Sequence, residues 1–153
     1  MGGYGAARLG LRWPGVFGAA SMLGAGPLQL DFLVDDPNLQ PIELRRMILA
    51  EVYGNDPAVF EAQSPWRIAE AAVATLPPGF RLRQIIGSAD FTVQYNRLFH
   101  QHLDAIGLVH DWRELPGVSH SMPAILAAMG TEFWRFHAGF FADADLVSRD
   151  GFD

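Results

Sequence analysis

The two side chains best placed for chemistry are a carboxylate and an imidazole, each in a loop that follows a predicted strand. Asp90 lies in the segment IIGSADFT and His120 in the segment LPGVSHSM. In a parallel sheet, the loops beyond the carboxyl ends of the strands collect catalytic and ligand-binding groups. A carboxylate that orients an imidazole is an arrangement used for general acid–base chemistry. We therefore take Asp90 and His120 as the candidate catalytic residues.

Both residues also have plainer interpretations. Asp90 stands just before a predicted helix that begins near Thr92, where a short acidic side chain often caps the first turn. His120 is flanked by glycine and serine, and a histidine in such a loop is often only a surface residue. The residue types alone leave these alternatives open.

The other titratable residues fit structural positions better. His100 and His102 are two apart on a predicted helix, so they point away from each other, cannot share a metal and are expected to be solvated. Asp104 and Asp111 compete with Asp90 as the acid, but one falls inside a helix and the other inside a strand. The remaining groups are His110 at a strand start, His137 beside an aromatic helix stripe, and the loop acids Asp31, Asp35 and Asp36, which lack calcium-loop spacing.

The composition excludes several classes of function. With 11 basic and 17 acidic side chains, the net charge of −6 leaves no basic patch for a nucleic acid. The absence of cysteine excludes disulfides and thiolate sites. No apolar run reaches the roughly 18 residues of a membrane span, and the stretch GGYGAAR lacks the third glycine of a dinucleotide-binding turn. We expect no cofactor, no metal, no nucleic-acid partner and no membrane span, and a cytoplasmic location.

The predicted elements alternate between helix and strand, which is typical of an α/β fold with a doubly wound, mostly parallel sheet. Between the first two strands, residues 27–78 are expected to form an inserted helical segment. The last helix is expected to run unbroken from Ser121 along an aromatic stripe to Phe140. The predicted strands are residues 16–23, 80–86 and 109–115. The other predicted helices are residues 2–12, a helix from Pro41 to Val52, a helix that begins directly after Ser64, and residues 92–106.

The opening stretch MGGYGAARLGLRWPGVF resembles the nucleophile elbow of a serine-esterase family of the α/β-hydrolase superfamily, which reads G-H-S-M-G-G-Y-G-A before a helix. The resemblance continues through YGNDPAVFEAQSP and through the segments around Asp90 and His120, and so covers nearly the whole chain. It implies that Asp90 is the acid that orients the imidazole and that His120 is the general base. It also implies that the backbone N–H of Met1 helps to bind an oxyanion and that Gly2 is the last glycine of the elbow.

The family's nucleophilic serine has no counterpart in these residues, because the resemblance starts at the position after it. We expect no other serine to replace it, since a nucleophile must lie within hydrogen-bond reach of the base. The serines considered are expected in structural positions: Ser21 in a strand, and Ser64, Ser119 and Ser121 at helix starts.

The sequence therefore predicts that residues 1–153 are the C-terminal portion of an α/β-hydrolase domain whose N-terminal strands are missing. The resemblance implies a carboxylic ester hydrolase, or an acyltransferase, acting on a small-molecule ester in the intact enzyme and inactive as this chain. The alternative is a non-catalytic remnant or interaction module, and an exposed sheet edge would favour self-association. The apolar residues Leu28, Leu30, Phe32 and Leu33 either line an acyl pocket or pack the inserted helices.

Overall fold

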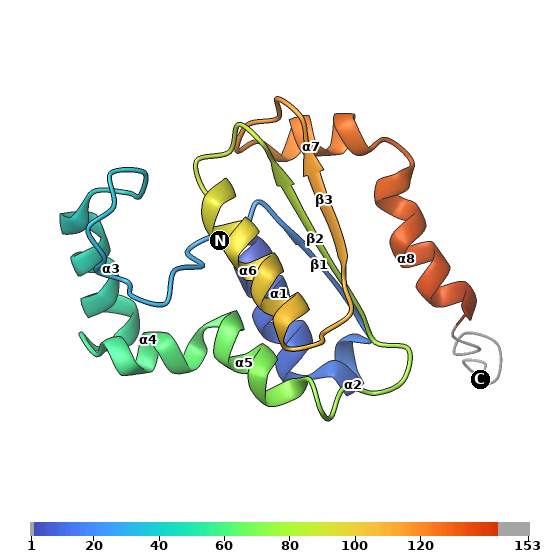
Figure 1. Ribbon diagram of the computed structural model, residues 1–153, viewed down its shortest axis with the longest axis horizontal. Coiled ribbons are helices and arrows are strands. Elements are labelled where there is room, and N and C mark those ends of the chain that lie inside the picture. Colours follow the sequence, from blue (N-terminus) through green and yellow to red (C-terminus); the bar gives the residue numbers. More distant parts are fainter. Residues whose placement is uncertain (1, 144–153) are drawn as a thin grey trace, which may run out of the picture.

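The computed structural model describes residues 2–143 (Figure 1). A parallel three-stranded sheet of order β1-β2-β3 forms its centre. The strands are β1 (Ala19–Leu23), β2 (Arg81–Gly87) and β3 (Asp111–Leu115). The helices are α1 (Gly2–Arg12), α2 (Pro14–Phe17), α3 (Ile42–Tyr53), α4 (Pro57–Gln63), α5 (Pro65–Ala72), α6 (Val93–Ala105), α7 (Met122–Met129) and α8 (Glu132–Asp143).

Helices cover both faces of the sheet, as Figure 1 shows. On one face, α1, α5 and α6 enclose the largest core, which includes Leu11, Met22 and Phe99. On the other face, Ile85 of β2 packs against Ile125 of α7 in a smaller core. The expected α/β architecture with a doubly wound parallel sheet is confirmed, and the loops at the carboxyl ends of the three strands meet at one edge.

Small residues let α1 lie directly on β1. A Cβ atom added to Gly3 would stand 2.4 Å from the carbonyl oxygen of Leu23, and one added to Gly10 would stand 2.5 Å from the Cβ of Ala20. Gly3 and Gly10 are therefore required by close packing, because a side chain at either position would push the helix off the strand.

A third group of apolar side chains belongs to the segment between β1 and β2. Phe32, Leu49 and Phe60 are buried together, and the rings of Phe32 and Phe60 lie 4.5 Å apart. Helices α3 and α4 lie beside the sheet, and α5 leads the chain back toward it (Figure 1).

Three predictions about the elements were wrong. The strand expected at residues 16–23 begins only at Ala19, because Pro14 opens the short helix α2 and leaves Val16 77% exposed. Helix α4 was not expected after the YGNDP break, although Asp56 caps it through the N–H of Ala58 at 2.8 Å. The last helix is two helices, because Gly130 takes a positive φ of 52° between α7 and α8.

Among the helices of residues 2–143, none has both the length and the apolar character needed to cross a membrane.

Candidate active site

Asp90 and His120 are joined by a hydrogen bond. The loop after β2 carries Asp90 and the loop after β3 carries His120, and Nδ1 of the imidazole lies 2.8 Å from Oδ2 of the carboxylate. The Asp90 side chain is fully buried, whereas the His120 side chain is 43% exposed. A buried carboxylate on Nδ1 makes that nitrogen the protonated one and leaves Nε2 as the basic atom. No group in residues 2–143 forms a hydrogen bond with Nε2.

The second oxygen of Asp90 fixes the carboxylate in place. Its Oδ1 accepts hydrogen bonds from the backbone N–H and from the hydroxyl of Thr92, each at 2.8 Å. The local turn at the start of α6 and the bond to His120 thus use different oxygens of one carboxylate. The capping interpretation of Asp90 and its pairing with an imidazole are therefore compatible, and the structure contains both contacts.

A buried network continues behind Thr92. Asn96 of α6 donates from Nδ2 to the carbonyl oxygens of Ala25 at 2.8 Å and Thr92 at 3.0 Å. Gln84, which is fully buried in β2, donates to Oδ1 of Asn96 at 3.1 Å. These bonds tie the loop that carries Asp90 to β2 and to the turn after β1. Buried polar networks of this kind hold side chains in one arrangement.

The loops after β2 and β3 are held together directly. Ala89 donates its backbone N–H to the carbonyl oxygen of Val118 at 3.0 Å, and the N–H of Gly117 donates to the hydroxyl of Ser88 at 2.8 Å. A Cβ atom at Gly87 would stand 1.9 Å from the Val118 carbonyl oxygen. Only glycine allows this approach, which sets the separation of the acid and the imidazole.

The turn after β1 completes the surroundings of the pair. Gly24 has a positive φ of 50°, and a Cβ atom there would stand 3.4 Å from Oδ2 of Asp90 and 3.6 Å from the His120 ring. The ring of Phe91 also packs against the imidazole, with its centroid 4.7 Å from that of His120. Groups at the ends of all three strands therefore surround the imidazole.

A cavity of about 230 Å³ opens beside His120. Most of its wall is apolar and comes from the segment between β1 and β2, including Leu28 and Phe32. Both residues also belong to buried cores, so each of them lines the cavity and also packs in the interior. Leu33 packs against the Phe32 cluster.

The polar groups of the cavity wall are mostly engaged within the protein. The Arg45 guanidinium donates to the carbonyl oxygens of Phe32 and Val34, each at 2.8 Å, and to that of Gln40 at 2.9 Å. Burial, together with the hydrogen bond that its hydroxyl donates to Asp36, raises the pKa of Tyr95 to about 12. Within the described residues, the buried Oε1 of Gln29 is an acceptor without a partner.

The remaining candidates from the sequence lie elsewhere. Met1 lies outside the described residues. Ser64 and Ser121 cap α5 and α7 as expected, and Ser21 accepts a hydrogen bond from Arg83 at 3.0 Å. Asp111 lies in β3 beside Arg113 at 3.4 Å, away from the acid position.

The prediction that His100 and His102 are solvated was wrong. His102 stacks on Trp66 with ring centroids 4.2 Å apart, and His100 stacks on Trp112 at 4.6 Å. Both rings cover tryptophan faces because α6 packs on the sheet and on α5 along that side.

Sequence reasoning also missed the residues that hold the pair, namely Gly24, Gly87, Thr92 and Asn96. The D-x-T spacing from Asp90 to Thr92 is the usual signal of an Asx turn and could have indicated the first contact. The others depend on segments brought together by the fold.

Comparison with solved structures gives similar folds. The S-formylglutathione hydrolase of Staphylococcus aureus matches with a TM-score of 0.59 and 22% identity, covering 92% of this chain and 51% of that one. A fluorophosphonate-binding serine hydrolase of the same organism matches with a TM-score of 0.64 and 21% identity, covering 91% and 50%. Carboxyl esterase 2 of the fungus Tuber melanosporum matches with a TM-score of 0.56 and 15% identity, covering 92% and 50%.

The chain thus spans about half the length of these solved structures. No protein-family model matches it, and no curated protein sequence matches it. The likeness is carried by the fold, a parallel sheet with helices on both faces. The chain has the fold of the C-terminal portion of an α/β-hydrolase.

Proposed function

We propose that Asp90 and His120 are the acid and the general base of a serine-dependent carboxylic ester hydrolase. The observation that carries the proposal is the 2.8 Å bond between His120 Nδ1 and a buried carboxylate in loops that follow adjacent strands. The solved structures with this fold include a carboxyl esterase and two other hydrolases, which supports the same reaction class. This chain would form one half of the catalytic unit.

In the proposed reaction, the serine comes from a protein segment outside these 153 residues, as the resemblance of the opening stretch implies. His120 Nε2 takes the serine proton as the oxygen attacks the ester carbonyl, and then protonates the departing alcohol. Asp90 holds the proton on Nδ1 and stabilises the imidazolium that forms. The backbone N–H at the position of Met1 would donate to the oxyanion, and each such donor contributes on the order of 3 kcal/mol.

The cavity favours a neutral ester with an apolar group. Its wall is mainly apolar, and the Arg45 cation is already engaged with backbone carbonyl oxygens. A substrate that carries carboxylates, such as a glutathione thioester, would find no free cation among these wall residues. Water and a second alcohol compete for the acyl group in such enzymes, so acyl transfer belongs to the same proposal.

The 153-residue chain should show no His120-dependent hydrolysis of p-nitrophenyl butyrate. A rate above background that disappears in His120→Ala would overturn the proposal that the nucleophile lies outside this chain.

The positive test uses the protein encoded by the reading frame extended upstream through a Gly-x-Ser codon run. In that protein, His120→Ala and Asp90→Asn should each lower kcat by roughly 10³- to 10⁴-fold. His137→Gln, a histidine change on α8, serves as the control and should retain activity. Equal activity of His120→Ala and the parent would contradict the assigned base.

A second candidate is a non-catalytic remnant or interaction module. It is favoured by the sheet, in which β1 pairs with β2 alone among residues 2–143 and so leaves one edge unpaired. A stop codon or frameshift directly upstream of Met1 would favour this candidate, whereas an open frame that encodes the elbow would favour the hydrolase.

A further inference from the structure

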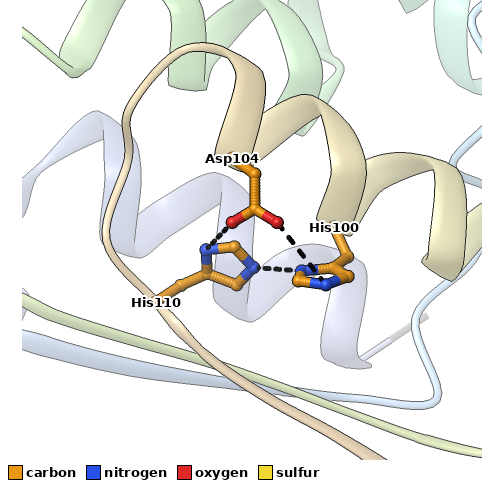
Figure 2. A group of neighbouring side chains, drawn as sticks. All are labelled: His100, Asp104 and His110. Atoms are coloured by element: carbon orange, nitrogen blue, oxygen red, sulfur yellow. Dashed lines mark hydrogen bonds and ion pairs between the residues drawn. The ribbon is translucent and has the colours of Figure 1, made fainter.

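We propose that His100, Asp104 and His110 form a binding site for a divalent transition-metal ion, with Zn²⁺ as the ion that best suits the three donors. Figure 2 shows the three side chains pointing toward one another. One ligand atom from each residue lies within 4.8 Å of the other two. Two imidazoles and a carboxylate are a ligand set typical of zinc.

The backbone brings these residues together from two segments. His100 and Asp104 are four residues apart on α6 and therefore share one face of the helix. His110 follows the turn after α6, just before β3. That turn is closed by the N–H of Gly107 on the Asp104 carbonyl oxygen at 3.0 Å and by the N–H of Leu108 on that of Leu103 at 2.9 Å. The third ligand is thus positioned by the end of the helix that carries the other two.

The His110 ring is already oriented as a ligand. Its side chain is only 1% exposed, and its Nδ1 lies 2.9 Å from the carbonyl oxygen of Leu108. A carbonyl oxygen can only accept a hydrogen bond, so Nδ1 carries the ring proton and Nε2 carries the lone pair. This Nε2 faces Nδ1 of His100 at 2.8 Å. A backbone carbonyl on the second nitrogen is the support that metal-binding histidines commonly have.

His100 and Asp104 can adjust around an ion. Tetrahedral zinc with Zn–N bonds of about 2.0 to 2.1 Å places its donors about 3.4 Å apart, so the two imidazole nitrogens must separate by about half an ångström. His100 is partly exposed and stacked on Trp112, along whose ring it can slide. Asp104 is 62% exposed, and its Oδ2 lies 3.6 Å from His100 Nε2.

Charge and protons balance on binding. When Nδ1 of His100 binds the ion, its ring proton moves to Nε2, next to the Asp104 carboxylate, and no net proton is lost. The carboxylate offsets one of the two positive charges, and water can fill the remaining position on the exposed side. A hydrogen-bonded histidine pair without a carboxylate would leave the dication uncompensated.

The site is distinct from the Asp90–His120 pair. Asp90 precedes the first residue of α6, whereas His100 and Asp104 lie in the C-terminal half of this helix and His110 follows it. About 10 Å along the helix axis separates the start of α6 from His100, the nearest of the three ligands. The expected consequence is structural, because an ion would clamp the C-terminal end of α6 to the start of β3. The inference does not depend on the proposed hydrolase activity.

The test uses the untagged 153-residue chain after EDTA treatment and dialysis. Calorimetric titration with ZnCl₂ should give one site per chain, and added Zn²⁺ should raise the melting temperature. Titration with Co²⁺ should give the visible absorption of a tetrahedral ion with nitrogen and oxygen ligands.

Two variants separate metal binding from folding. His100→Gln and the exposed Asp104→Asn should each weaken Zn²⁺ binding by about 10-fold or more, while circular dichroism confirms that they are folded. His102→Gln, on the same helix but outside the three residues, should bind like the parent. Absence of a Zn²⁺ heat, or equal binding in Asp104→Asn and the parent, would overturn the inference.

Discussion

At the scale of a single residue, the Asp90 carboxylate uses its two oxygens for different contacts. Oδ1 accepts from the backbone and hydroxyl of Thr92, and Oδ2 accepts from His120. Since Thr92 holds the carboxylate and Asn96 holds Thr92, the direction of the imidazole is set by the interior of the sheet. His120 itself, at the surface, then needs few contacts of its own.

The replacement Asp90→Asn tests whether the carboxylate keeps the ring proton of His120 on Nδ1. An amide can present its NH₂ group to the imidazole, so the preference of His120 for the Nδ1–H tautomer should fall or reverse. The ¹⁵N chemical shifts of the His120 ring at pH 8 measure the tautomer ratio. Asp111→Asn is the matched control, because Asp111 is an acid at the start of β3 that pairs with Arg113 and not with His120. Identical ring shifts in Asp90→Asn and the parent would contradict the assigned role.

At the scale of elements, helix α8 is attached to the sheet through a buried cation. Arg83 of β2 donates to the carbonyl oxygens of Glu132 at 3.3 Å and Phe133 at 3.1 Å, and its guanidinium lies 4.3 Å from the centre of the Phe136 ring. Burial lowers the pKa of Arg83. His137 stands next to Phe136 on the same helix, and burial and the nearby Arg83 charge lower its pKa below the ordinary value.

The lowered pKa of His137 predicts a loss of stability on mild acidification. The unfolded chain binds a proton at His137 near pH 6.5, whereas the folded chain binds it only at lower pH. The unfolded state therefore holds more protons in this window, and the free energy of unfolding should decrease as the pH falls from about 7 to 5.5.

Urea denaturation at several pH values measures this effect, with His137→Gln as the comparison. The lowered pKa of His100 acts in the same direction, so the prediction concerns the difference between the two proteins. The pH dependence should be smaller in His137→Gln. Parallel curves for both proteins would show that His137 does not titrate with unfolding.

For the whole molecule, the sequence predicted helices and strands correctly where the local sequence signals and the packing of the fold favour the same structure. The helix Gly2–Arg12 was predicted with its observed bounds, and the parallel arrangement of the three strands follows from their alternation with helices. The errors at Ala19 and Gly130 arose because a proline and a glycine outweighed apolar runs. The pairing of His100 with His110 escaped prediction because it depends on a turn that reverses the chain, which spacing along one helix does not reveal.

The unpaired edge of β1 predicts that whole chains associate with one another. The N–H of Gly24 and the carbonyl oxygen of Gly18 bond to β2. Since backbone groups alternate in direction along a parallel strand, the N–H and C=O of Ser21 face away from β2, toward the unpaired edge. Such an edge can pair with another chain. The parent should therefore show weight-average masses above the monomer that rise with concentration.

Sedimentation velocity over a concentration series of Ser21→Pro and Ser21→Ala separates the edge from the side chain. Both variants lose the hydroxyl that accepts from Arg83, but only proline removes the outward N–H, and an edge strand tolerates it because the bonds to β2 come from the neighbouring residues. Ser21→Ala should associate like the parent and Ser21→Pro should shift toward the monomer. If Ser21→Pro associates as strongly as Ser21→Ala, the contact must lie on another surface, because the proline variant has lost the N–H that pairing at this edge would use.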